Sequence, residues 1–363
     1  MRKWVTRWHG RLRRLRQRLR EADLDALVVS HWPNVLYLTN FHGSAALLVV
    51  TPRRTRLFTD GRYRTQARHE MRAAQVVVAS GSLLAAAGAW LRSEHPERIG
   101  FEAPRLAFAA CQQLGKAFGK PSRLIPTANF VEGLRALKDA AEIASIRRAV
   151  RLGSRVFADV LPLVRPGVCE LDLAAEIEYR MKRAGATAPA FETIVASGPR
   201  TAWPHARASS KRLAKNELVV LDLGAILRDY CSDMTRTVYL GRPSARIRRL
   251  YAAVREAQQS AFEAVQSGVA ARQVDAAARG TLKACGFDGY FIHGTGHGLG
   301  LEIHEEPRLG HGVGTRLAAG HVVTLEPGVY VPGWGGIRIE DVVVVRRSGA
   351  ERLTPTPHGL IAL

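Results

Sequence analysis

Helical and strand-like hydrophobic patterns alternate along the first 130 residues. Leu12, Leu15 and Leu19 recur at helical spacing with arginines on the other face, which predicts an amphipathic helix. Strands that alternate with helices predict an α/β domain at residues 1–130. The apolar runs expected to form strands are 25–30, 45–50, 55–58 and 75–79, and a further helical pattern covers 82–93.

The pattern changes in the rest of the chain, where helices and strands come in blocks. Two helices are predicted at 140–164 and 171–184, the first ended by Pro166 and Gly167. This order predicts an α+β domain at residues 131–363, made of two similar halves that each lay helices on a curved antiparallel sheet. The later elements expected are strands at 191–197, 217–225 and 229–240, helices at 244–265 and 273–285, and strands at 322–326 and 337–345.

The charge of the chain is strongly positive but does not indicate a nucleic-acid partner. The formal net charge is +21, yet only eight of the 53 basic residues are lysines, and the arginines are spread along the whole chain. No nucleic-acid-reading motif accompanies them, so we expect no nucleic-acid role. No apolar run approaches the ~20 residues that span a bilayer, so we expect no membrane partner. The four cysteines form no CxxC pair, which is typical of a reducing cytoplasm.

Four acidic residues interrupt strand-like apolar runs. Asp222 lies in VVLDLGA and Asp233 in DYCSDMTRT, and a hairpin would place the two carboxylates side by side. Glu326 in HVVTLEPG and Glu340 in GGIRIEDVVVV repeat the pattern. An unpaired carboxylate is very costly to bury, so each needs a cation or a charged partner. For Asp222 the alternative to a metal ion is an ion pair with an arginine, either Arg236 or Arg338.

The most unusual segment is HGTGHGLGLEIHEEP, residues 293–307, with three histidines and four glycines. With His297, the four acids form a set of hard oxygen ligands and one imidazole, which suits Mn²⁺, Co²⁺ or Zn²⁺ in a two-metal site. Two ions about 3.5–4 Å apart can share carboxylates and hold a bridging water that becomes the nucleophile. The zincin motif HExxH fails because residue 308 is Arg, and no phosphate-binding, dinucleotide-binding or GxSxG motif occurs.

These motifs, with LEPGVYVPGWGGIRIED and SGPRTAWPHA, resemble the metal-dependent Xaa-Pro peptidases, prolidase and aminopeptidase P, of the pita-bread fold. The resemblance runs from about residue 130 to the C-terminus, and the N-terminal part resembles the creatinase-type domain of the same proteins. It implies a homodimer, a proline-containing peptide or dipeptide as substrate, and two divalent ions, with Mn²⁺ first and Co²⁺ or Zn²⁺ also suitable. The ligands it implies are Asp222, Asp233, His297, Glu326 and Glu340.

The resemblance also implies roles for the other residues. His205, His293 and His304 would contact the substrate, and His304 would donate to the scissile carbonyl oxygen as it becomes negative. Glu326 would be both ligand and proton shuttle for the bridging water. Arg338 would hold the ligand carboxylates, and Tyr230 would line the substrate pocket.

Two distinctions stay open at this point. The sequence does not separate an Xaa-Pro dipeptidase from an Xaa-Pro aminopeptidase. The alternatives to a two-metal enzyme are a metal-free creatinase-like hydrolase and a non-catalytic binding protein of the same fold. Both are disfavoured because all five expected ligand positions are intact.

Overall fold

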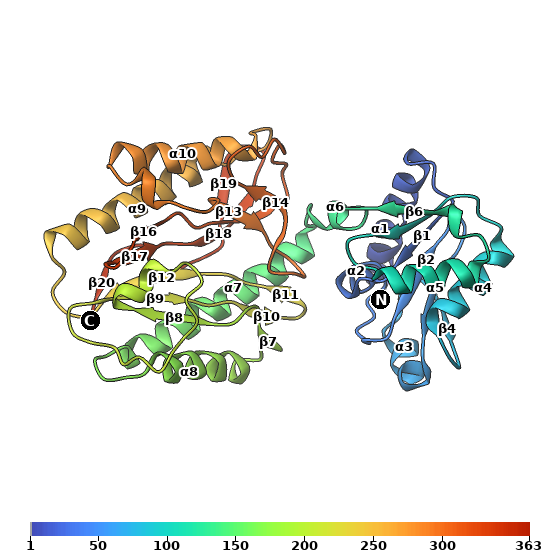
Figure 1. Cartoon of the computed structure of the whole chain (residues 1–363), viewed down its shortest axis with the longest axis horizontal. Helices are drawn as coiled ribbons and strands as arrows, with labels where there is room; N and C mark the ends of the chain where they lie inside the picture. Colours follow the sequence, from blue (N-terminus) through green and yellow to red (C-terminus); the bar gives the residue numbers. More distant parts are fainter. Residues whose placement is uncertain (1) are drawn as a thin grey trace. The chain divides into compact units, whose positions relative to one another are not determined.

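The computed structural model describes residues 2–363 and divides into two compact units, Met1–Arg135 and Ala136–Leu363 (Figure 1). The sequence pattern placed the boundary at residue 130. Within residues 2–363, no helix combines the length and the apolar composition needed to cross a membrane.

The first unit is a six-stranded mixed sheet packed with helices. The strand order is β4-β3-β2-β1-β5-β6, in which β1, β5 and β6 run parallel and β2 is antiparallel to both of its neighbours. The expected amphipathic helix is α1, whose Leu12, Leu15 and Leu19 are buried. The strands are β1 Ala26–Val29, β2 Leu47–Val50, β3 Thr55–Thr59, β4 Gln75–Val78, β5 Ile99–Glu102 and β6 Leu124–Thr127. The helices are α1 Arg2–Glu21, α2 Trp32–Thr39, α3 Arg64–Glu70, α4 Leu83–Glu94, α5 Phe108–Phe118 and α6 Glu132–Arg135.

The second unit contains two helix pairs. The first helix, α7, begins at a capping box. The Asp139 side chain accepts the backbone N–H of Glu142, and the Glu142 side chain accepts the backbone N–H of Asp139. It ends at Val160 and continues as a short 3₁₀ turn, Leu161–Leu163, so the α-helix is shorter than the 140–164 expected. The four helices are α7 Ala140–Val160, α8 Glu170–Arg183, α9 Ala245–Ala264 and α10 Ala271–Ala284.

Each helix pair covers its own mainly antiparallel sheet, and the two pairs lie on opposite sides of the strands (Figure 1). One sheet has the order β20-β12-β9-β8 and the other β14-β13-β15-β18-β19, with a separate hairpin β16-β17. The bounds in the first half are β7 Ala188–Pro189, β8 Ile194–Ser197, β9 Leu218–Asp222, β10 Ala225–Leu227, β11 Tyr230–Cys231 and β12 Thr235–Tyr239. Those in the second are β13 Gly296–Gly298, β14 Glu305–Leu309, β15 Val322–Leu325, β16 Gly328–Val331, β17 Gly335–Arg338, β18 Asp341–Val345 and β19 Ala350–Arg352. The last strand, β20 Ile361–Ala362, returns to the first sheet and runs parallel to β12.

Two hydrophobic clusters match this division. One joins α7 and α8 to β9 and β12, through residues such as Phe157, Ile177 and Leu221. The other joins α9 and α10 to β15 and β18, through residues such as Val254 and Val343. Because each cluster fills the space between one helix pair and one sheet, the expected α+β arrangement of two halves is confirmed.

The long hairpin that carries the first two acids is interrupted. β9 pairs with β12, with Asp222 opposite Thr235, and the tip pairs separately as β10 with β11. The interruption lies at Gly224, where a Cβ would stand 2.3 Å from the carbonyl oxygen of Ser232. Only glycine permits so close an approach of the two chains. The strands expected at 217–225 and 229–240 are therefore each split in two, with Asp222 and Asp233 at the break.

Candidate metal centre

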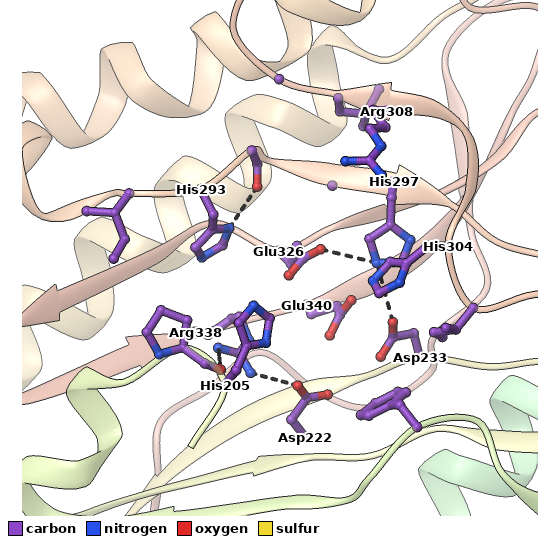
Figure 2. A pocket seen from close by; sticks show the side chains of 18 of the residues that line it. His205, Asp222, Asp233, His293, His297, His304, Arg308, Glu326, Arg338 and Glu340 are labelled. Atoms are coloured by element: carbon purple, nitrogen blue, oxygen red, sulfur yellow. Dashed lines mark hydrogen bonds and ion pairs between the residues drawn. The ribbon is translucent and has the colours of Figure 1, made fainter. Parts of the chain in front are cut away.

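The four acids lie where strands of the two sheets end. Asp222 is the last residue of β9, and Asp233 lies between β11 and β12. Glu326 follows β15 directly, and Glu340 lies between β17 and β18. Figure 2 shows their carboxylates around one space, with His297 and His304 entering from the β13–β14 side.

The imidazole of His297 is close to two of these carboxylates. Its Nε2 lies 3.4 Å from Oε1 of Glu326 and 3.7 Å from Oδ2 of Asp233. One ligand atom from each of Asp233, His297 and Glu340 falls within 4.8 Å of the others. These separations are too long for hydrogen bonds and suit atoms that share a cation between them.

His297 is in the form that a metal ligand requires. Its Nδ1 lies 2.9 Å from the carbonyl oxygen of Gly298, which can only accept, so Nδ1 carries the proton and Nε2 presents its lone pair to the acids. Burial lowers the pKa of His297 to about 4, so the ring is neutral at neutral pH.

Asp222 has an arginine partner and still retains an unused oxygen. Arg338 Nη2 donates to Asp222 Oδ2 at 2.7 Å, which is one of the two ion pairs considered from the sequence. Arg236 pairs instead with Asp341 at 2.8 Å. Asp222 Oδ1 is buried, and no described residue donates a hydrogen bond to it. The ion pair therefore coexists with a free acceptor rather than replacing a metal ligand.

Glu340 resembles Asp222 in that only one of its two carboxylate oxygens accepts a hydrogen bond from the described residues. Its Oε2 accepts from the hydroxyl of Thr235 at 2.7 Å, whereas its buried Oε1 has no hydrogen-bond donor among the residues described. A buried acceptor without a donor costs free energy unless something compensates for it. Two such oxygens in one cluster of acids fit the coordination of divalent cations by this donor set.

Three of the acids, Asp233, Glu326 and Glu340, hold protons more strongly than usual when no cation is present. Burial, reinforced by the charges of Glu340 and Asp222, raises the pKa of Asp233 well above its usual range. Burial also raises the pKa of Glu340 well above its usual range, with Glu326 and Asp222 adding to the effect. Burial raises the pKa of Glu326 to about 7, against the opposing charge of Arg338. A bound cation reverses this preference because it stabilises the charged carboxylates.

A cavity of about 850 Å³ opens onto the acids, and its wall includes nine of the ten residues expected at the site. Apolar side chains, among them Phe191, Ile194 and Ile303, line the rest of its wall with polar groups between them. Such a lining is typical of a small-molecule site. The nine expected residues are His205, Asp222, Asp233, His293, His297, His304, Glu326, Arg338 and Glu340.

Tyr230 is the expected residue that the structure does not bring to the cavity wall. It lies on β11 and is buried, and its hydroxyl donates to Oε1 of Glu142 on α7 at 3.0 Å. Successive side chains on a strand point to opposite faces, so its place in the sequence near Asp233 does not place its ring beside that carboxylate.

Two further polar residues at the site were not expected from the sequence. Arg338 Nη1 donates to the hydroxyl oxygen of Tyr330 at 2.9 Å, and that hydroxyl lies 2.8 Å from Nε2 of His293. Thr235 contacts both Glu340 and Arg338, at 2.7 and 3.1 Å. For Thr235 the available signal was the strand expected at 229–240, in which a two-residue period would put Thr235 on the same face as Asp233.

His293 is fully engaged with the protein. Its Nδ1 lies 2.8 Å from the carbonyl oxygen of Gly294, and its Nε2 faces Tyr330. Burial lowers its pKa to about 4. His304 differs, because its ring stands edge-on to His297 with centroids 4.4 Å apart and lines the cavity. Burial lowers the pKa of His304 as well, assisted by the charge of Arg308.

Comparison with known proteins assigns both units. The creatinase/prolidase N-terminal domain matches residues 11–137, and metallopeptidase family M24 matches residues 144–347. An uncharacterized peptidase of Bacillus subtilis is 36% identical over 353 residues, which cover 97% of this chain and 100% of that protein.

Solved structures agree with this assignment. An Xaa-Pro dipeptidase from Bacillus anthracis superposes with a TM-score of 0.96 at 36% identity, over 98% of this chain and 100% of that one. An X-Pro aminopeptidase from Thermotoga maritima superposes with a TM-score of 0.88 at 33% identity, over 94% and 98%. The expected pita-bread catalytic domain with a creatinase-type N-terminal domain is thus confirmed, and the chain belongs to metallopeptidase family M24.

Proposed function

We propose that this chain uses two divalent metal ions to hydrolyse the peptide bond before proline. The observation that carries the proposal is the group of four carboxylates in one cavity with His297, in which the buried Asp222 Oδ1 and Glu340 Oε1 have no donor among the described residues. Support for the substrate comes from the similar structures named as an Xaa-Pro dipeptidase and an X-Pro aminopeptidase. A metal-free hydrolase offers no cation to these two buried oxygens, which have no donor among the described residues.

The residues proposed to hold the ions are the five expected ligands, Asp222, Asp233, His297, Glu326 and Glu340. When bound, the ions would polarise the scissile carbonyl and lower the pKa of an attacking water. We propose Mn²⁺ as the working ion because four carboxylates and one imidazole form a hard donor set. Co²⁺ and Zn²⁺ are the next candidates.

The proton chemistry is proposed for two residues of the cavity wall. Glu326, whose pKa rises to about 7 in the absence of metal, is suited to take a proton from water and pass it to the leaving nitrogen. His304, neutral and facing the cavity, would donate to the carbonyl oxygen as it gains negative charge. His205 is exposed on the cavity wall, where we propose that it contacts the substrate.

Arg338 and His293 are proposed to act on other residues of the site. Arg338 fixes Asp222, Tyr330 and Thr235, so it orients two of the carboxylates directly or through one hydroxyl. His293 is tied to Tyr330 and Gly294, so we propose that it supports the wall of the cavity and the orientation of Arg338.

Proline supplies a reason for a dedicated site. Its bond is a tertiary amide without an N–H, so a peptidase that grips that N–H loses a contact. A cavity with apolar walls beside an electrophilic centre can bind the ring without it.

The test is a substrate panel with the metal-loaded protein: an Xaa-Pro dipeptide, an Xaa-Pro-Yaa tripeptide, and an Xaa-Ala dipeptide as control. Hydrolysis of either proline substrate well above that of the alanine dipeptide is expected. The ratio of dipeptide to tripeptide rates separates the dipeptidase from the aminopeptidase. Equal rates on all three would overturn the proline specificity.

We also propose that the chain works in the cytoplasm as a homodimer. All four cysteines are free thiols, which agrees with a reducing compartment. The dimer rests on the resemblance to Xaa-Pro peptidases, and light scattering of the purified chain tests it.

A further inference from the structure

Helix α10 presents two charged side chains to the glycine-rich segment that carries His293 and His297. Asp275 is only 1% exposed, and Arg279 lies one turn further along the helix. Arg279 Nε donates to Asp275 Oδ2 at 2.7 Å. This pair, named here the α10 clamp, lies outside the set of five proposed ligands.

Both members of the α10 clamp bind the segment at residues 291–295. Asp275 Oδ1 accepts two hydrogen bonds from Thr295, from the backbone N–H at 3.0 Å and from the hydroxyl at 2.8 Å. Arg279 donates through Nη1 to the carbonyl oxygen of Phe291 at 2.9 Å and through Nη2 to that of His293. The guanidinium also lies over the Phe291 ring, 4.3 Å from its centroid.

Thr295 connects the α10 clamp to two of the proposed ligands. Its carbonyl oxygen accepts the backbone N–H of Glu326 at 2.8 Å, and His297 follows two residues later. Thr295 is fully buried, so these hydrogen bonds are shielded from water. The path from Asp275 to the Glu326 backbone thus runs through Thr295 by two hydrogen bonds, and the path to His297 continues along the backbone from Thr295.

Beyond the α10 clamp, the segment is held where β13 pairs with β14 and β15 and where the backbone N–H of His297 donates to the Thr324 hydroxyl at 3.0 Å. Thr295 stands between Gly294 and Gly296, and glycine has the greatest conformational freedom of any residue. Gly296 is needed because a Cβ there would stand 2.0 Å from the carbonyl oxygen of Thr324. The close approach thus requires glycine at residue 296, and Asp275 holds Thr295, the residue between the two glycines.

We propose that Asp275 and Arg279 are positioning residues of the metal centre, which set the places of His297 and of the Glu326 backbone through Thr295. This inference rests on the proposed function, in which both of those residues bind metal. The α10 clamp touches no ligand side chain, so its effect is on the geometry of the site and hence on its affinity for the ions.

The experiment compares Asp275→Asn and Arg279→Lys with wild type, using full-length protein stripped by chelator. The asparagine keeps the shape but loses one acceptor for Arg279. The lysine keeps the positive charge but lacks the planar fork that binds Asp275, Phe291 and His293 together. Glu176→Gln on α8 is the control, because it removes the carboxylate of a one-third-exposed Arg–Glu pair at the same i,i+4 spacing, outside the described cavity lining.

Mn²⁺ affinity is measured by calorimetry without substrate, and the visible spectrum of the Co²⁺ form reports ligand geometry. We expect about 10- to 100-fold weaker Mn²⁺ binding in both clamp variants, an altered Co²⁺ spectrum, and no change in the control. A lowered melting temperature with unchanged affinity and spectrum would overturn the proposal and reduce the α10 clamp to a structural ion pair. If Asp275→Asn does not fold, the Mn²⁺ affinity and Co²⁺ spectrum of Arg279→Lys decide alone. That variant is expected to fold because the Arg279 side chain is one-third exposed.

The same measurements distinguish this proposal from the proposed function. A wild-type protein that binds two ions but cleaves no Xaa-Pro substrate overturns the substrate assignment and leaves the comparison of affinities valid. A wild-type protein that binds no ion overturns the positioning role.

Discussion

Arg338 donates a buried hydrogen bond to one oxygen of Asp222, at 2.7 Å, and leaves the other oxygen of that carboxylate without a donor among the described residues. The arginine therefore fixes the plane of the carboxylate without using its full acceptor capacity. The same guanidinium donates to Tyr330 and to the carbonyl oxygen of Pro204, and its Nε donates to Thr235. Positive charge and orientation are supplied by one side chain, and the remaining oxygen is available to a cation.

We predict that Arg338→Lys lowers kcat/KM by about 10- to 100-fold, as substitutions behind a metal ligand commonly do. An ammonium keeps the charge but cannot donate to four separate acceptors in a planar fork. Steady-state rates on an Xaa-Pro substrate measure the loss. Arg147→Lys, in a partly exposed pair with Glu351, is the control. Equal rates for Arg338→Lys and wild type would show that charge alone suffices.

The sequence predicted the acids but not their partners. An Asp in an apolar strand implies a compensating charge, and Arg236 and Arg338 were equal candidates for Asp222. The decision depends on which strands lie side by side: β17 and β18 bring Arg338 to Asp222 and Asp341 to Arg236. Pairing between residues far apart in the chain does not alter the local pattern of apolar and polar residues, so that pattern could not identify the partners.

The same limit explains the two tyrosines. Tyr230 was expected at the pocket because it lies three residues before Asp233, yet the split of the hairpin directs its hydroxyl to Glu142 on α7. Tyr330 was not singled out from the sequence, yet its hydroxyl lies between His293 and Arg338. Element order and the motif-bearing residues were predictable, whereas the bond partners required the packing of the sheets.

The metal-free protein is expected to lose stability as the pH rises from 6.5 to 8. The pKa of Glu326 is raised from 4.5 to about 7 in the folded state, and those of Asp233 and Glu340 are also raised. A raised carboxyl pKa means that the folded protein binds more protons than the unfolded chain. Stability from this source is full below the unfolded pKa and is lost as the pH passes the folded pKa.

The choice of pH window limits the opposing contribution of histidine. The pKa values of His293, His297 and His321 are lowered to about 4, so these residues destabilise the folded state mainly below the unfolded pKa of ~6.5 and little above pH 7. Melting temperatures measured between pH 6.5 and 8, with and without Mn²⁺, test the carboxylates. The carboxylate pKa values are supported if the melting temperature of the metal-free protein falls as the pH rises and if this fall is smaller with Mn²⁺ or in Glu326→Gln. A flat profile contradicts it.

His304→Ala is predicted to lower kcat by about 100- to 1000-fold, the usual effect of removing a donor to a developing oxyanion. Metal content is expected to stay at the wild-type level because His304 is not among the five proposed ligands. Elemental analysis and steady-state rates on the same preparation separate these effects. His69→Ala on α3 is the control for losing an exposed histidine. A parallel loss of metal and activity would make His304 a ligand instead.

Gly296→Ala is predicted to destabilise the protein by about 1–3 kcal/mol or more, since its Cβ would stand 2.0 Å from the backbone of Thr324. The strand must move to accept it, and His297 moves with the strand. Chemical denaturation gives the stability, and calorimetry gives the Mn²⁺ affinity, which is expected to fall. Gly289→Ala, where an added Cβ meets nothing within 4 Å, is the control. Unchanged values for both variants would mean that the segment adapts freely.

The central claim is that the five-residue cluster binds the ions on which hydrolysis depends. We predict that Asp222→Asn remains folded but loses metal and activity, because the substitution neutralises the carboxylate whose free oxygen faces the site.

The most direct measurement titrates chelator-stripped wild type and Asp222→Asn with Mn²⁺, following bound metal and the release of proline from an Xaa-Pro dipeptide together. If the dipeptide is not cleaved, an Xaa-Pro-Yaa tripeptide is followed by release of its first residue. The account predicts no turnover without metal, turnover that rises with occupancy in wild type, and neither occupancy nor turnover in Asp222→Asn. Full activity of the metal-free wild type, or an unchanged metal content in Asp222→Asn, would contradict it.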